Sequence, residues 1–599
     1  MAQRTNVIRS HGAGAVTEAD IGSEVVVAGW VQRRRDHGGV AFFDVRDATG
    51  LVQVVADPAE HPTVAHLKME YCVRVRGEVR SRPAGTENPD LPTGKIEIGV
   101  VELDVLAPAK TLPFMIDDRT DVDEAVRLRH RYLDLRRPRM AANLRARSRA
   151  TAVIRRTLDD MGFLEVETPT LINSTPEGAR DMLVPSRLRP GEFYALPQSP
   201  QLFKQLLMIA GVERYFQIAR CYRDEDFRSD RQLEFTQLDL EGSFWERDDV
   251  LETIEVVLAA VTREIRGVDV PLPFPRLTWH EAMDRYGSDK PDMRFDMEIV
   301  DLSDLFPNSE FGVFKNALEA GGTVRGINGG PQEWSRARAD AMTERAKELG
   351  ARGLVWMVSQ DDGSLRSPVA KFLDEAEIEG IKSRMEVSPG DVLLIAADRW
   401  RTTVGVLGGL RLDLGRPNTH DDLAYLWVVD FPLFEEDEEG AITFSHHPFT
   451  SPTSIDEMAN DPANAISNAY DAVLNGVELG SGSIRIHDPK VQRQVFEILG
   501  IDGRTAERRF GWFLEALEYG TPPHGGFAFG VDRLVMVLQN ETSIREVIPF
   551  PKTQTGLDPM TGAPTWVDED QLAELGVELS RESKMRRDDP DEDGSEESG

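Results

Sequence analysis

The alternation of apolar and polar positions predicts an antiparallel hairpin at residues 216–241, whose sequence is FQIARCYRDEDFRSDRQLEFTQLDLE. Apolar residues alternate with polar ones through Phe216, Ile218 and Leu238, so both ends of the stretch are predicted to be strands. The middle is charged, lacks glycine and is predicted to form the turn. Because arginine can clamp a phosphate or carboxylate with two hydrogen bonds, Arg223 and the acidic run after it indicate an anion site. A solvated, charged hairpin tip remains the alternative.

Alternating segments also recur at regular spacing in the N-terminal part of the chain. They predict five strands, at residues 25–31, 40–47, 51–56, 71–80 and 95–106. Five short strands with glycine-rich turns fit the OB-fold, a small β-barrel that binds single-stranded nucleic acid on an exposed face. On that face Arg35, Phe42 and Gln53 would supply charge, a stacking surface and a base-edge reader. Phe42 could equally belong to the barrel core.

Three later stretches combine helix and strand patterns. Residues 148–170 are predicted to form an amphipathic helix and then a strand ending at Pro169, and residues 197–208 a turn followed by a helix. Residues 525–538 are predicted to form a glycine-rich strand and an apolar helix. There Arg533 follows a close backbone approach at Gly530, which suits a stacked or phosphate-facing role.

The length of 599 residues is too great for one core and indicates three or four domains. Composition is that of an ordinary globular protein, and no run of 18 apolar residues exists, so no membrane span is expected. The N-terminus lacks an apolar signal segment, and Cys72 and Cys221 are the only cysteines, which favours a reducing cytoplasm. Neither cysteine has metal-ligand neighbours, so no zinc site is expected.

Charge is strongly and unevenly distributed. The net charge of −34 disfavours a protein that coats nucleic acid nonspecifically, and no DNA partner is expected. Residues 127–156, however, hold eleven arginines and a single acid, Asp134. Such a local basic face can bind RNA, and an ion-paired helix face is the alternative. Residues 581–599 are rich in acids, Gly and Ser and are predicted to be disordered.

The stretches 148–170, 216–241 and 525–538, in this order, resemble the three signature motifs of class II aminoacyl-tRNA synthetases. The chain is similar in sequence to the bacterial type of aspartyl-tRNA synthetase, most clearly in the segments FRSDRQLEFTQLD, TPEGARD and GFAFGVDRL. The similarity covers nearly the whole chain. The resemblance implies ATP-dependent attachment of L-aspartate to tRNA through an aspartyl-adenylate, with Mg²⁺ as cofactor. It also implies a homodimer built around Pro169.

The resemblance implies an α+β multidomain fold with an antiparallel catalytic sheet. Its expected parts are an OB-fold anticodon-binding domain (1–108), a linker (109–125), a first catalytic part (126–289), an inserted α+β domain (290–422), a second catalytic part (423–580) and the tail (581–599). The insert offers no identifiable chemistry and is interpreted as a scaffold for RNA contact or an interface.

Site residues follow by matching positions to the family. The resemblance places aspartate on Glu177, Gln201, Lys204, Arg223, Asp239, His446 and Arg485, and ATP on Arg223, Asp224, Glu225, Gln232, Glu478, Gly530, Val531, Asp532 and Arg533. It makes Arg223, Glu478 and Arg533 the catalytic residues, and Arg35, Phe42 and Gln53 the anticodon readers. Asp471 and Glu478 could hold Mg²⁺ through carboxylate oxygens.

Two of these residues have competing interpretations from chemistry alone. A lysine on a helix, such as Lys204, is usually solvated, whereas the resemblance places it on the substrate's side-chain carboxylate. The pair His446-His447 invites a metal site, but no third ligand follows at metal spacing. A guanidinium suits a planar carboxylate, so Arg485 is expected to read that group.

The choice of tRNA is predicted from two loop positions. Family members that charge only the aspartate tRNA tend to carry Leu and Lys where this chain has His37 and Gly85. Smaller or uncharged residues impose less penalty on the asparagine anticodon, so the hypothesis is that tRNA(Asp) and tRNA(Asn) are both charged. The alternatives are a strictly discriminating enzyme, an asparaginyl or lysyl enzyme, and a non-catalytic tRNA-binding relative.

Overall fold

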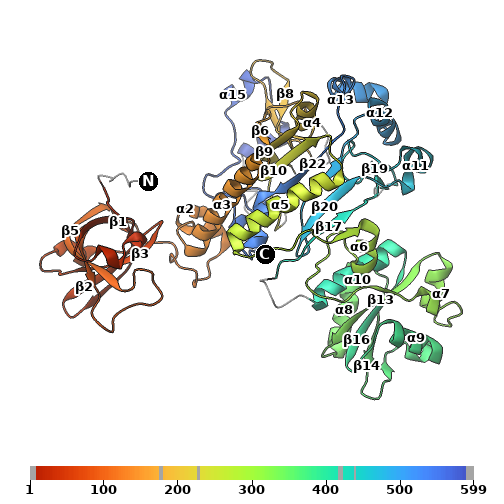
Figure 1. Ribbon diagram of the computed structural model, residues 1–599, viewed down its shortest axis with the longest axis horizontal. Coiled ribbons are helices and arrows are strands. Elements are labelled where there is room, and N and C mark those ends of the chain that lie inside the picture. The colour runs from red at the N-terminus through yellow and green to blue at the C-terminus, as the bar shows by residue number, and fades with distance from the viewer. Residues whose placement is uncertain (1–7, 175–179, 225–228, 416–421, 437–439, 589–599) are drawn as a thin grey trace. The chain divides into compact units, whose positions relative to one another are not determined.

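The computed structural model describes residues 8–174, 180–224, 229–415, 422–436 and 440–588. The chain forms two compact units, residues 1–138 and 139–599 (Figure 1). Glu177 and Glu225, both predicted to contact substrates, lie outside the described residues.

The first unit contains the predicted five-stranded barrel, which is confirmed as closed with the order β1-β2-β3-β5-β4. Its strands are β1 (Glu24–His37), β2 (Val40–Asp47), β3 (Gly50–Ala56), β4 (Cys72–Ser81) and β5 (Ile96–Ala107). Alternate residues such as Val27, Phe43 and Val75 fill the core. The turn between β1 and β2 is Gly38-Gly39, both with positive φ, as a two-residue hairpin turn requires.

The first unit extends beyond the predicted barrel boundary at residue 108. Two short helices, α1 (Glu124–Arg129) and α2 (Arg131–Asp134), follow a segment without regular helix or strand. Arg136 donates to the Glu70 carboxylate at 2.8 Å and stacks over Trp30 at 4.6 Å. These contacts explain why the segment up to residue 138 groups with the barrel.

The second unit is built on an eight-stranded sheet with the order β11-β17-β20-β21-β22-β10-β9-β6. Its strands are β6 (Leu164–Glu165), β9 (Arg214–Tyr222), β10 (Glu234–Ser243), β11 (Arg276–Thr278), β17 (Tyr425–Val429), β20 (Ala469–Leu474), β21 (Val477–Ile484) and β22 (His524–Gly530). Strands β9 and β10 pair antiparallel, which confirms the predicted hairpin. Only the edge pairs β6–β9 and β11–β17 among these strands are parallel.

One face of this sheet is covered by helices and forms the main core. The helices are α3 (Pro138–Asp160), α5 (Arg247–Arg266) and α14 (Val531–Leu538), and Leu238 and Leu240 of β10 pack beneath them. Helix α3 begins ten residues before its predicted start, because Pro138 is tolerated in the first helical turn and good helix formers follow.

The other face of the sheet carries the polar side chains of β10. A second group of helices and short strands lies on this side. These are β7 (Leu183–Pro185), β8 (Phe193–Ala195), α4 (Gln201–Ile209), α12 (Pro489–Ile498) and α13 (Gly503–Leu517). Helix α4 of this group contacts β10. Leu202 of α4 packs with Phe449 and with Phe510 of α13 in a smaller core. The predicted helix after residue 200 is thereby confirmed.

Residues 300–415 form a separate five-stranded sheet with flanking helices, an α+β arrangement as the resemblance implied for the insert. The strands, in sheet order, are β12 (Val300–Asp301), β13 (Thr323–Pro331), β16 (Asp391–Asp398), β14 (Val355–Ser359) and β15 (Leu365–Arg366). The helices are α7 (Gly312–Glu319), α8 (Arg336–Glu348), α9 (Glu375–Arg384) and α10 (Trp400–Gly415), and α6 (Trp279–Tyr286) precedes them.

The remaining elements are short. They are β18 (Phe434–Glu436), β19 (Ile442–Phe444), α11 (Ile455–Asn460), α15 (Glu569–Glu574), α16 (Arg581–Asp588) and the 3₁₀ turns at Ala13–Ala15, Glu18–Asp20, Pro62–His66, Ser303–Leu305, Ala370–Phe372, Pro462–Asn464 and Ile544–Glu546. The prediction of disorder from residue 581 is wrong for α16, where ion pairs such as Lys584–Glu578 and Arg587–Glu569 support a polar helix. No helix in the described ranges is long and apolar enough to cross a bilayer.

Candidate active site

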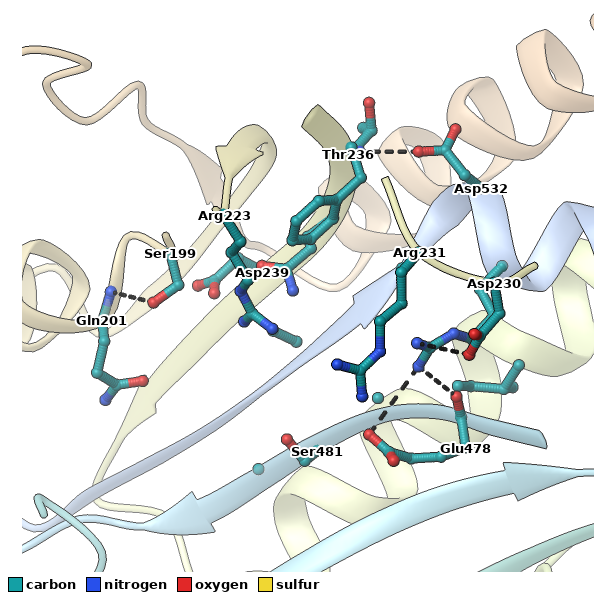
Figure 2. Close-up of a pocket in the computed structure, with 18 of the residues that line it drawn as sticks. Ser199, Gln201, Arg223, Asp230, Arg231, Thr236, Asp239, Glu478, Ser481 and Asp532 are labelled. Carbon is teal, nitrogen blue, oxygen red and sulfur yellow. Dashed lines mark hydrogen bonds and ion pairs between the residues drawn. The ribbon is translucent and has the colours of Figure 1, made fainter. Parts of the chain in front are cut away.

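A cavity of about 270 Å³ opens on the polar face of the large sheet. Figure 2 shows Gln201 and Asp239 on one side of it and Asp230 and Glu478 on the other. The structure brings the following predicted residues together around this cavity: Gln201, Lys204, Arg223, Gln232, Asp239, His446, Glu478, Arg485, Gly530, Asp532 and Arg533. Residues more than 300 positions apart in the chain therefore share one site.

The cavity contains a buried cluster of two cations and two carboxylates, which we call the charge cluster: Lys204, Asp239, Glu241 and Arg485. Lys204 Nζ lies 3.0 Å from Asp239 Oδ1 and 3.2 Å from Glu241 Oε2. Arg485 donates two parallel hydrogen bonds to Glu241, of 2.8 and 3.1 Å. Each of these side chains is at most 1% exposed, so Lys204 is not the solvated helix lysine of the alternative interpretation.

The sequence of β10 explains why two carboxylates enter the cavity together. Successive strand residues point to opposite faces, so Asp239 and Glu241 share one face while the leucines beside them pack in the core. Glu241 lies opposite Gly526 of β22. A Cβ at residue 526 would lie 1.9 Å from Glu241 Oε2, so only glycine leaves room for this carboxylate.

Arg485 is oriented by two further side chains. Its Nη1 donates to Ser483 Oγ at 2.6 Å and lies 2.6 Å from His447 Nε2. Burial and the adjacent Arg485 charge hold the pKa of His447 well below its usual range. His447 is therefore neutral at physiological pH and accepts the hydrogen bond from Arg485.

The two carboxylates of the charge cluster have different pKa values. Burial raises the pKa of Asp239 to about 6, although Lys204 opposes this shift. Burial also opposes ionisation of Glu241, but Arg485 and Lys204 outweigh it and hold its pKa at about 2. Glu241 is thus a fixed anion, whereas Asp239 titrates within reach of neutral pH.

The other end of the cavity is more open and its ion pairs are longer. Arg533 Nη1 donates to the Glu478 carbonyl oxygen at 2.7 Å, and its Nη2 lies 3.3 Å from Asp230. The Glu478 carboxylate is 38% exposed and 4.0 Å from Arg533. Arg223 stacks over the ring of Phe235 at 5.3 Å. The partly exposed guanidinium of Arg533 and carboxylate of Glu478 leave hydrogen-bonding capacity for a charged ligand.

Two residues predicted to bind ATP, Gln232 and Asp532, line the cavity and also make hydrogen bonds within the protein. The Gln232 amide exchanges two hydrogen bonds with the Lys552 backbone, and Asp532 accepts from Arg147 and from the Thr236 amide. Val531 packs in the main core and does not line the cavity. These contacts fix the walls of the open end of the cavity.

Asp224 also does not line the cavity. Its backbone amide donates to the carbonyl oxygen of Arg180 at 3.1 Å. Gln201 lines the cavity, and its side-chain nitrogen Nε2 is buried without a hydrogen-bond partner among the described residues. That orphaned donor is available to a ligand.

The predicted Mg²⁺ residues lie near His446. Asp471 is 3.0 Å from His446 Nε2, and the negative charge of Asp471 raises the pKa of His446 against the opposing effect of burial. Across the described ranges, no three His, Cys, Asp or Glu side chains converge as a complete metal site. The two histidines have different partners: His446 contacts Asp471, and His447 contacts Arg485.

On the barrel, Arg35, Phe42 and Gln53 lie on one outer face. Arg35 is directly opposite Phe42 in the β1–β2 ladder and donates to Gln53 Oε1 at 3.0 Å. Phe42 is half-buried and outside the barrel core, which Phe43 occupies. His37 and Gly85 are exposed, and Gly85 has a φ of +86°.

Sequence reasoning missed Glu241 and the role of His447. The signal for Glu241 was two acids spaced by two in an otherwise buried strand, followed by a Gly-Gly pair in β22. For His447 there was no local signal, because its partner Arg485 lies 38 residues away.

A family model described as class II tRNA synthetases (D, K and N) matches residues 123–554, and a model of the OB-fold nucleic acid binding domain matches residues 25–106. The first match covers most of the chain. The chain therefore belongs to the class II tRNA synthetases.

Within that class, the chain belongs to the aspartate–tRNA ligase family. The aspartate–tRNA(Asp/Asn) ligase of Moorella thermoacetica is 56% identical over 578 residues, covering 95% of this chain and 96% of the relative. The enzyme of the same name from Symbiobacterium thermophilum is 53% identical over 582 residues, covering 94% and 98%.

Solved structures share the fold. Asparaginyl-tRNA synthetase from Pyrococcus horikoshii, complexed with asparaginyl-adenylate, superimposes with a TM-score of 0.55 at 20% identity, covering 90% of this chain and 98% of that one. A putative aspartyl-tRNA synthetase from Leishmania major gives 0.57 at 19% identity, covering 92% and 95%.

Proposed function

We propose that the protein joins L-aspartate to ATP as aspartyl-adenylate and then transfers the aspartyl group to tRNA, charging both the aspartate and the asparagine tRNA. The observation that carries the amino-acid assignment is the charge cluster, in which two buried cations, Lys204 and Arg485, line the cavity. The names of the relatives, aspartate–tRNA(Asp/Asn) ligase, support the choice of tRNAs.

The charge cluster suits a substrate with a side-chain carboxylate. Lys204, His446 and Arg485 would receive that carboxylate, and Asp239 and Gln201 the ammonium end together with Glu177. A lysine side chain would bring a third cation beside two buried ones, which is costly in a low dielectric. Asparagine would offer Lys204 and Arg485 only a neutral oxygen, so its side chain could not form the stronger, charge-assisted hydrogen bonds that a carboxylate makes.

The open end of the cavity suits the nucleotide. Arg223 over Phe235, with Gly530 and Arg533, would hold the adenine and phosphates of ATP. Glu478, with Asp471, would hold Mg²⁺ through carboxylate oxygens, and the ion would neutralise phosphate charge when bound. Carboxylate oxygens are the kind of ligand that Mg²⁺ prefers, and Asp471 would then contact both the ion and His446.

The chemistry needs little acid–base assistance from the chain. The α-carboxylate of aspartate attacks the α-phosphorus of ATP and pyrophosphate leaves. The terminal ribose hydroxyl of tRNA then attacks the carbonyl carbon and AMP leaves. The contribution of Arg223 and Arg533 is to align two anions and to stabilise the negative charge of the transition state.

The anticodon would be read on the outer face of the barrel by Arg35, Phe42 and Gln53. The exposed His37 and the side-chain-free Gly85 would leave room for either last anticodon base, C or U. A bulky or charged side chain at these positions would exclude one base.

A homodimer is part of the proposal. Large apolar side chains are exposed on segments around Pro169: Leu164 (56%), Leu171 (52%), Leu183 (57%) and Phe193 (45%). Contiguous exposed apolar residues of this size mark interaction surfaces. A second copy of the chain would cover them.

Charging assays test the function. Purified asparagine tRNA and aspartate tRNA are each incubated with radiolabelled aspartate, ATP and the protein. Both should be aspartylated at comparable rates. A rate for the asparagine tRNA hundreds of times below that for the aspartate tRNA would leave a strictly discriminating enzyme, and no charging of either would reject the function.

A further inference from the structure

The arginine-rich run divides into arginines that are used internally and arginines that are not. Within helix α3, Arg139 pairs with Glu546 at 3.0 Å, Arg147 with Asp532 at 2.7 Å and Arg155 with Glu165 at 2.9 Å. These three arginines hold the helix to its own unit. They bear out the ion-paired interpretation of the run only in part.

Three other arginines of α3, Arg145, Arg149 and Arg156, are exposed, and their side chains make no hydrogen bond or ion pair with any residue that the structure describes. With Ala152 they occupy positions i, i+4, i+7 and i+11, which lie on one face of a helix. We call this face the arginine stripe. It spans about 16 Å along the helix axis.

The stripe points away from the core. Ala146, Ala150, Val153, Ile154 and Leu158 occupy the opposite face of α3 and pack in the main core against the large sheet (Figure 1). The guanidinium groups are therefore presented to solvent by a long, well-anchored helix. In a chain of net charge −34, three adjacent uncompensated cations are a local exception.

We propose that the arginine stripe is a contact surface for the phosphate backbone of tRNA, separate from the anticodon face of the barrel. The proposal rests on the tRNA-charging function proposed above and adds a second point of attachment to the RNA. Arginine forks match phosphate oxygens, and a rigid helical array of them fixes the RNA without reading its sequence.

A second copy of the chain fits the stripe less well than RNA does. The centres of protein–protein interfaces are depleted of charged residues, and the stripe has only Ala152 as an apolar member. The apolar side chains that suit a dimer contact, such as Leu164 and Leu171, lie on the segments after α3. The stripe therefore has the chemistry of a polyanion site.

The test compares two variants of the full chain. The first carries Arg145→Gln, Arg149→Gln and Arg156→Gln; the matched control carries Arg155→Gln, which removes an arginine of the same helix that Glu165 already neutralises. Binding of aspartate and asparagine tRNA transcripts is measured between about 50 and 200 mM salt. Aspartate-dependent pyrophosphate exchange and the molecular mass in solution are measured in parallel.

For the triple variant, the slope of log Kd against log salt should fall by roughly 2 to 3, and Kd near 100 mM salt should rise at least roughly tenfold for both tRNAs. Pyrophosphate exchange should be unchanged. Restoring charge with lysine at the three positions should recover most of the slope, and Arg155→Gln should alter it little.

Two outcomes would overturn the proposal. An unchanged salt slope for the triple variant would show that the three arginines make no contact with RNA phosphates. Conversion of the variant to a monomer would assign the stripe to contact with a second copy of the chain. Absence of aspartate-dependent exchange in the unmodified protein would instead reject the proposed function, so the two failures are distinguishable.

Discussion

The two ends of the cavity differ in how completely the protein satisfies its own charges. In the charge cluster, Lys204, Arg485 and their carboxylates are at most 1% exposed and bonded at 2.8–3.2 Å. At the open end, which we propose as the nucleotide end, the side chain of Arg533 is 21% exposed and that of Glu478 is 38% exposed, with 4.0 Å between them. The end proposed to select the amino acid is therefore held in place by buried ion pairs, whereas the side chains at the end proposed to hold ATP are only partly buried and more loosely paired.

The largest expected effect comes from breaking the charge cluster. Arg485→Leu should abolish aspartate-dependent pyrophosphate exchange while ATP binding persists. It should also destabilise the fold by about 3–5 kcal/mol, because Glu241 is left as a buried, unpaired anion. Exchange assays, nucleotide binding and denaturant unfolding measure the three effects. A normal aspartate KM in this variant would refute the assignment of Arg485.

The same contrast predicts that the nucleotide end can be changed without harm to the fold. Arg533→Gln should lower exchange by about 10²–10³, the usual loss when one group that stabilises a developing charge is removed. Its free energy of unfolding should change by less than about 1 kcal/mol, because partly exposed ion pairs contribute little. A loss of stability as large as that of Arg485→Leu would erase the distinction between the ends.

Gly526→Ala probes the room that the charge cluster needs. The added Cβ would meet Glu241 Oε2 at 1.9 Å and the Leu240 carbonyl oxygen at 2.3 Å, so the strand or the carboxylate must move. We expect a destabilisation of about 1–3 kcal/mol and a raised aspartate KM. The matched control is Gly405→Ala in helix α10, where no atom lies within 4 Å and stability should not fall.

The pKa of Asp239 predicts a pH dependence. Only the ionised carboxylate can hold the ammonium group, so aspartate KM should rise up to about tenfold per pH unit below pH 6. Asp239→Asn should show a high KM that does not vary over this range. A KM of the unmodified protein that is constant from pH 7 to 5 would contradict the role of Asp239.

The pKa shifts of Asp239 and Glu241 have opposite directions, so the two carboxylates change the free energy of unfolding with pH in opposite ways. The pKa of Asp239 in the folded protein lies above its ordinary value of 3.8. Its contribution to the free energy of unfolding is therefore fully present below pH 3.8 and is lost as the pH rises through about 6. Glu241 has a folded pKa of about 2, so its contribution is present above pH 4.5 and is lost as pH falls through about 2.

The smallest expected effect concerns tRNA choice. His37→Leu combined with Gly85→Lys should disfavour the asparagine tRNA relative to the aspartate tRNA by about 1–3 kcal/mol. Gly85 has a positive φ, so Gly85→Ala is the control for backbone strain without the lysine charge. An unchanged ratio of the two charging rates would show that these loops do not discriminate.

Local sequence patterns were sufficient to predict the helices and strands named below, but they were insufficient to predict the charge cluster. The period-two alternation correctly predicted the barrel strands and the β9–β10 hairpin, because strand faces are decided by neighbouring residues. Glu241 was missed, since its partner Arg485 is 244 residues away and its space depends on Gly526. Resemblance to a family supplied Lys204, whose burial contradicts the usual behaviour of a helix lysine.

The central claim is that the charge cluster selects a side-chain carboxylate. Pyrophosphate exchange measured separately with aspartate, asparagine and lysine tests it most directly. The account predicts that aspartate supports rapid exchange, with kcat/KM at least about 10³ above that for either of the other two, as expected for a site built to hydrogen-bond a particular substrate group. Comparable exchange with asparagine or with lysine would contradict it.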